Sequence, residues 1–136
     1  MSSRFVLPAV LCIGLLCGCN SESRLNVKGR VMKNGAALKV SDPEFVRVIF
    51  FPVTTDGKPP RNTYIAAYDS EQGSFEAVGP DGAGIPPGKY RIAVEHNRKR
   101  KDLLKGAFDG DHSPFVFDVD ASTKELVLDL DKAPAK

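Results

Sequence analysis

The chain has 136 residues, of which 19 are Lys or Arg and 17 are Asp or Glu, so the formal net charge at pH 7 is +2. This balance argues against nucleic-acid binding, which usually needs a concentrated basic face. All three cysteines precede residue 20, which excludes thiol chemistry and disulfides in the rest of the chain.

The first 18 residues predict a signal peptide. Arg4 provides a positive start, and the apolar run of residues 5–16 follows it. This run is too short to cross a bilayer core, which takes roughly 20 helical residues, but it has the length of a signal-peptide hydrophobic region. A buried N-terminal helix of a cytoplasmic domain is the alternative, and Pro8 argues against it because proline breaks a short helix.

The residues before and at Cys19 read Leu-Cys-Gly-Cys and resemble the bacterial lipobox, which ends in an obligatory cysteine. The resemblance implies that a signal peptidase recognises Leu16, Cys17 and Gly18 and cleaves before Cys19. It also implies a diacylglyceryl group on the Cys19 thiol and acylation of the new amino group. Two or three acyl chains make a stable membrane anchor, whereas one gives only reversible binding. A plain secretory signal with a chance cysteine is the alternative.

Cleavage would remove Arg4 and leave a chain with 18 basic and 17 acidic residues, a net charge near +1. Residues 19–25 would hold the lipidated cysteine and a polar tether. Residues 26–131 would form one β-domain, and residues 132–136 a flexible tail. Asn20 is not the Asp that retains such lipoproteins at the inner membrane in some bacteria, so the resemblance favours the outer membrane.

Beyond the tether, apolar and polar residues alternate in short runs separated by Gly, Pro, Asn and Asp, which predicts strands and turns. The expected strands, in chain order, are 26–32, 45–53, 63–68, 74–78, 89–96, 114–119 and 125–130.

Three of these segments carry more specific expectations. Asn34-Gly35 predicts a hairpin, because both residue types tolerate a positive φ. The run 45–53 is apolar on both faces, as a covered central strand would be. Residues 98–108 are the most helix-like part, with apolar residues that could form one or two turns. Seven short strands predict an all-β, seven-strand antiparallel sandwich of the immunoglobulin-like class.

Several motifs resemble the carboxypeptidase regulatory-like, or transthyretin-like, β-sandwich domains, most closely those of small bacterial lipoproteins. The motifs are VKGRVMKNGAAL, VRVIFFP, DSEQGSF, IPPGKYRIAV and the closing segment SPFVFDVDASTKELVLDL. The resemblance runs from about Val27 to Leu130. It implies the fold more than a function, because such sandwiches have many roles.

Few residues offer catalytic or metal chemistry. His96 ends an apolar face and is expected to be a strand-end or core-edge residue. Asp109, Asp111 and His112 could hold a cation, but they lack the spacing of a calcium loop, and a solvated turn is favoured. The acid pair in the turn Asp69–Gly73 is expected to serve turn geometry.

Known enzyme motifs are absent as well. The sequence has no G-x-S-x-G and no H-E-x-x-H motif. It also lacks the zinc signature of a carboxypeptidase catalytic domain and the terminal Tyr-Arg-Gly-Ser of transthyretin-like hydrolases. We therefore expect no enzyme activity, no metal and no cofactor.

A basic run is the one feature that points to an external partner. Arg98, Lys99, Arg100 and Lys101 follow one another, and Lys105 is close behind. They could contact anionic lipid headgroups, a glycan or a wall polymer. A solvated loop partly neutralised by nearby aspartates is the alternative.

Together these features predict an exported, noncatalytic and monomeric lipoprotein, a tethered binding or structural module of the cell envelope. Its expected partners are the membrane, through Cys19, and an envelope protein or glycan, but no nucleic acid. Two alternatives are an accessory subunit of an envelope complex or transporter, and an enzyme with an unrecognised site near His112.

Overall fold

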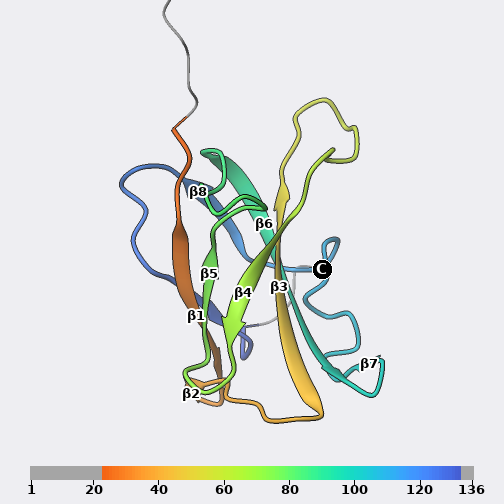
Figure 1. Ribbon diagram of the computed structural model, residues 1–136. Coiled ribbons are helices and arrows are strands. Elements are labelled where there is room, and N and C mark those ends of the chain that lie inside the picture. Colours follow the sequence, from red (N-terminus) through yellow and green to blue (C-terminus); the bar gives the residue numbers. More distant parts are fainter. Residues whose placement is uncertain (1–22, 133–136) are drawn as a thin grey trace, which may run out of the picture.

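The computed structural model describes residues 23–132, and the proposed lipobox lies outside them (Figure 1). The described residues form one strongly curled β-sheet. Its strands are β1 Val27–Lys33, β2 Ala36–Ala37, β3 Glu44–Pro52, β4 Tyr64–Asp69, β5 Ser74–Ala77, β6 Gly88–Arg98, β7 Lys101–Asp102, β8 Val116–Val119 and β9 Leu126–Asp129. The all-β class expected from the sequence is confirmed.

The sheet follows the order β2-β1-β5-β4-β3-β6-β7, with β8 added to β6 and β9 added to β1. All pairs are antiparallel except β1 with β9. The sheet continues through β4, which changes partner midway. Residues 64–66 of β4 pair with β3, and residues 67–69 pair with β5.

The core lies inside the curl and follows the alternation of the strands. On β6 the residues Tyr90, Ile92, Val94 and His96 are buried on one face, as expected. The Phe50 ring packs edge-on against the rings of Phe75 and Tyr90, with centroids 6.1 and 5.8 Å apart. Fully burying one large apolar side chain stabilises the fold by roughly 1.5–3 kcal/mol.

Two detailed expectations need correction. The run 45–53 is not covered on both faces throughout, since Phe45 is 48% exposed and Val53 is 43% exposed. Residues 98–108 form no helical turns. They contain the end of β6, the strand β7 and a series of turns, in which Lys105 and Gly106 have positive φ angles that interrupt a helix.

The strands define two poles of the domain. Leu25 and Ile85 exchange two backbone hydrogen bonds of 2.9 and 2.8 Å at one end, which we call the N-terminal pole. β1 and β6 both run away from it, to the turns at residues 34–35 and 99–100, which form the distal pole (Figure 1). At roughly 3.3 Å per residue, the 11-residue β6 separates the poles by roughly 33 Å. No helix within residues 23–132 is long and apolar enough to cross a membrane.

Candidate functional site

The basic run forms a tight hairpin at the distal pole. Arg98 ends β6 and pairs with Lys101 of β7, so Lys99 and Arg100 make a two-residue turn. Their φ angles are 48° and 66°, both in the left-handed region. Two successive residues with positive φ are the requirement of a type I′ hairpin turn. We call residues 98–101 the basic hairpin.

The cations of the basic hairpin are largely free of internal partners. Lys99, Arg100 and Lys101 are exposed, and none of them forms an ion pair with another residue of the described range 23–132. The same holds for the exposed Lys105. Arg98 has one long contact, 3.8 Å from Nη1 to Oε1 of Glu44, and its side chain is 56% exposed.

Asp102, the carboxylate closest in sequence to the basic hairpin, accepts hydrogen bonds from the backbone instead. Oδ1 of Asp102 accepts hydrogen bonds from the backbone N–H groups of His96 and Leu104, at 3.1 and 3.0 Å. Its Oδ2 accepts a third from Gly106, at 2.9 Å. Asp102 therefore fixes the backbone that follows the basic hairpin and makes no ion pair with its lysines or arginines.

His96 closes the core beneath the basic hairpin. Its Nε2 lies 2.8 Å from Oε2 of Glu44, and its side chain is only 8% exposed. A neutral ring donates its Nε2–H to the carboxylate. Nδ1 is buried and has no hydrogen-bond partner among residues 23–132. This contact agrees with the expected role of His96 as a core-edge residue.

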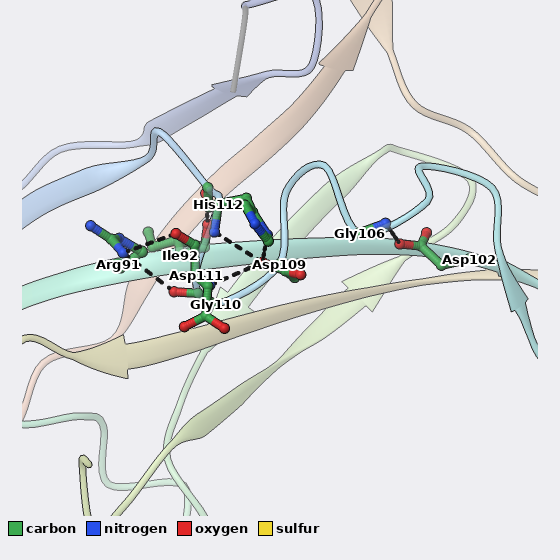
Figure 2. A network of polar contacts seen from close by, with 9 residues as sticks. Arg91, Ile92, Asp102, Gly106, Asp109, Gly110, Asp111 and His112 are labelled. Carbon is green, nitrogen blue, oxygen red and sulfur yellow. Dashed lines mark hydrogen bonds and ion pairs between the residues drawn. The ribbon is translucent and has the colours of Figure 1, made fainter. Parts of the chain in front are cut away.

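The second histidine, His112, lies in a turn that Asp109 begins (Figure 2). Oδ1 of Asp109 accepts hydrogen bonds from the backbone N–H groups of Asp111 and His112, at 3.0 and 2.9 Å, and lies 2.7 Å from the His112 ring Nδ1. The His112 side chain is 61% exposed. This arrangement is a turn fixed by one aspartate, as the sequence suggested.

The pKa of Asp109 reflects this turn. Partial desolvation acts to raise the pKa, but the hydrogen bonds from His112 and Asp111 outweigh it and hold the pKa below its ordinary value. No group of three or more His, Cys, Asp or Glu side chains within the described part of the chain is placed to hold a metal ion.

Arg91 lies beside the same turn. Its Nη1 donates long hydrogen bonds of 3.5 and 3.4 Å to the carbonyls of Gly110 and Asp111 (Figure 2). Its Nε is buried without a partner among residues 23–132. This pairing holds the Asp109 turn against the outer side of β6.

A shallow groove of about 880 Å³ crosses the outer side of β1, β5 and β4. Ala67 and Ser74 are among its small lining residues, and Lys28, Glu76 and Lys124 line it with charges of both signs. The sequence did not indicate this groove, because it depends on the curl of the sheet.

The lipobox residues Leu16, Cys17, Gly18 and Cys19 lie outside the described residues. No protein-family model, no curated protein and no solved structure matches the chain.

Proposed function

We propose that the chain is an exported bacterial lipoprotein, tethered by Cys19 at an envelope membrane, whose β-domain is a noncatalytic and monomeric binding or structural module. One observation carries this proposal. Leu25, six residues after Cys19, is held at one pole of the domain by its hydrogen bonds with Ile85, and a solvent-facing basic hairpin stands at the other pole.

The tether length supports a defined arrangement at the membrane. The chain from Cys19 to Leu25 spans at most about 20 Å when fully extended. The N-terminal pole of a lipidated protein would therefore stay close to the bilayer. The basic hairpin, roughly 33 Å farther along β6, would be presented to the envelope space when the domain stands upright.

We also propose that the curled sheet belongs with the seven-strand, immunoglobulin-like sandwiches of the transthyretin-like class. Two glycines of the resembling motifs support this. A Cβ atom on Gly29 would lie 2.2 Å from Cζ of Phe75, and one on Gly73 would lie 2.9 Å from the Ala37 Cβ. Both positions need glycine for close packing, which is the kind of constraint a shared fold imposes.

The test is the mass of the N-terminal peptide of the full-length protein, expressed in a Gram-negative host and recovered from its membranes. We expect a peptide that begins at Cys19 and carries a diacylglyceryl group. Cys19→Ala should abolish the modification and release the protein from the membrane fraction. Cys17→Ala is the matched control, since Cys17 would leave with the signal peptide and alanine is a small residue too.

An unmodified protein that retains residues 1–18 in the cytosol would contradict the proposal. Release of an unmodified but cleaved protein would support the plain secretory alternative instead. Separating the inner and outer membranes in the same preparation would then test the outer-membrane location, which the absence of Asp after Cys19 favours.

A further inference from the structure

We propose that the basic hairpin binds an acidic polysaccharide, a linear polymer with repeated carboxylate groups, on the side of the domain that faces away from the anchor. This inference rests on the proposed function, because only an anchored protein gives the two poles different surroundings. It goes beyond that function by naming the surface and the chemistry of its partner.

The turn of the basic hairpin has a strained backbone. For residues other than glycine, the left-handed region is sterically disfavoured. Lys99 and Arg100 both occupy it, at φ 48° and 66°. The chain builds the equivalent turn between β1 and β2 from Asn34 and Gly35, which tolerate such angles. The fold alone would thus favour small turn residues at positions 99 and 100, so the two long cations point to a role outside the fold.

Lys99, Arg100, Lys101 and Lys105 have no ion-pair partner within residues 23–132. The carboxylate of Asp102 is occupied by three backbone N–H groups. The positive field of the hairpin is therefore available to an external anion.

The hairpin ends in an exposed two-residue turn and does not line the groove across β1, β5 and β4. A single solvent-exposed ion pair contributes little binding free energy. Useful affinity at such a protruding site requires several pairs at once, which a polymer with closely spaced carboxylates supplies and a small anion does not.

The position of the basic hairpin distinguishes a polymer from a lipid as its partner. The basic hairpin lies roughly 33 Å from the N-terminal pole, and charges are screened beyond about 10 Å at 0.1 M salt. In an upright domain its cations could not act on the headgroups of the membrane that holds Cys19. A soluble polymer in the envelope space has free access to the same tip.

The experiment uses the full lipidated protein, incorporated into neutral phosphatidylcholine vesicles. The probe is polygalacturonate, with uncharged dextran as the polymer control. The test variant is K99N/R100G, which copies Asn34-Gly35 and so removes both charges while keeping the turn. The matched control is K58A/R61A, which removes one Lys and one Arg from exposed positions of the β3–β4 loop at the other pole.

We expect the wild-type vesicles to bind polygalacturonate but not dextran, with an affinity that falls as salt rises. With about 1 kcal/mol for each cation near a dense anionic surface, K99N/R100G should weaken binding roughly 30-fold. K58A/R61A should stay within about twofold of the wild type, since its charges lie on the other pole.

Three outcomes would overturn the inference: no binding by the wild type, equal weakening by both double variants, or capture of added phosphatidylglycerol vesicles without binding of polygalacturonate. The last result would identify a second membrane as the partner. Failure of the protein to enter the neutral vesicles would instead contradict the lipid anchor, so the two proposals fail in distinguishable ways.

Discussion

The two hairpins at the distal pole have turns with similar φ angles but different residue types. The turn between β1 and β2 uses Asn34 and Gly35 at φ 53° and 76°, and the turn between β6 and β7 uses Lys99 and Arg100 at 48° and 66°. The first pair suits the backbone, whereas the second pair strains it. A turn that serves only the fold can use the residues with the least backbone strain. The strained residues of the second turn therefore indicate a role other than folding.

The strands beneath the two turns are also fixed differently. In β1, Gly29 lets the Phe75 ring approach the backbone closely. At the base of β6, His96 and Glu44 make a polar contact at the edge of the core. The strand that leads to the first turn is therefore tightly packed at Gly29, whereas the strand that leads to the second turn ends in a polar contact.

The largest expected effect on stability is in β1, where Gly29 packs against Phe75. The Cβ atom of Gly29→Ala would lie 2.2 Å from Cζ of Phe75 and 2.5 Å from the Leu126 carbonyl oxygen. Because backbone and a buried ring would both have to move, we expect a loss of about 3 kcal/mol in the free energy of unfolding. Urea unfolding measures this, with the exposed neighbour Lys28→Ala as control. A loss below about 1 kcal/mol would show that β1 is loosely packed.

Glu44→Ala should have the next largest effect on stability, because it removes the polar contact with His96. It leaves the buried Nε2–H of His96 without its acceptor, which costs about 1–3 kcal/mol. The same urea experiment applies, and the exposed Glu71→Ala is the control for loss of a carboxylate. If the two variants lose equal stability, the His96 contact does not hold the base of the basic hairpin.

A hydrogen bond from Tyr68 holds the end of the first hairpin. Its hydroxyl donates to the Leu38 carbonyl, just after β2. Burial, with a smaller contribution from Asp69, raises the pKa of Tyr68 to about 12, from an ordinary 10. The folded state therefore holds this proton more tightly, so its contribution to stability is complete below pH 10 and is lost as the pH rises through 12.

The corresponding variant is Tyr68→Phe, with urea unfolding measured from about pH 8 to about pH 11, on either side of the ordinary tyrosine pKa of about 10. At the lower limit we expect a loss of about 1 kcal/mol for the missing hydrogen bond. Toward the upper limit the difference in the free energy of unfolding between variant and wild type should decrease. A difference that does not change with pH would contradict the raised pKa of Tyr68.

The smallest effects should have opposite signs at the two turns. Gly35→Ala places a side chain at φ 76° and should destabilise the protein by about 0.5–1 kcal/mol, although nothing lies within 4 Å of the added Cβ. Arg100→Gly relieves strain at φ 66° and should stabilise it by about 0.5 kcal/mol, after the entropy of the unfolded glycine is subtracted. Thermal unfolding of both variants compares them directly. Destabilisation by Arg100→Gly would mean that this turn is not strained.

The sequence predicted the features that depend on local pattern. Asn34-Gly35 carries a recognisable turn preference, and the inner face of β6 follows from its alternation. The turn at Lys99-Arg100 was missed because neither residue prefers a positive φ, so no local signal marks it.

The remaining features depend on contacts between distant strands. Glu44 lies 52 residues from His96, and only the register of β3 with β6 brings them together. The continuous curl through β4 likewise depends on which strands its two halves pair with, which the alternation of its residues does not specify.

The most direct test of the functional difference between the two hairpins is the thermal unfolding of K99N/R100G and wild type, each with and without polygalacturonate. A ligand that binds the folded state raises the unfolding temperature. We expect the variant to unfold at a higher temperature than the wild type when free, and to lose most of the increase that the polymer gives the wild type. An equal increase in both proteins, or a free variant that unfolds at a lower temperature, would contradict a strained turn kept for binding.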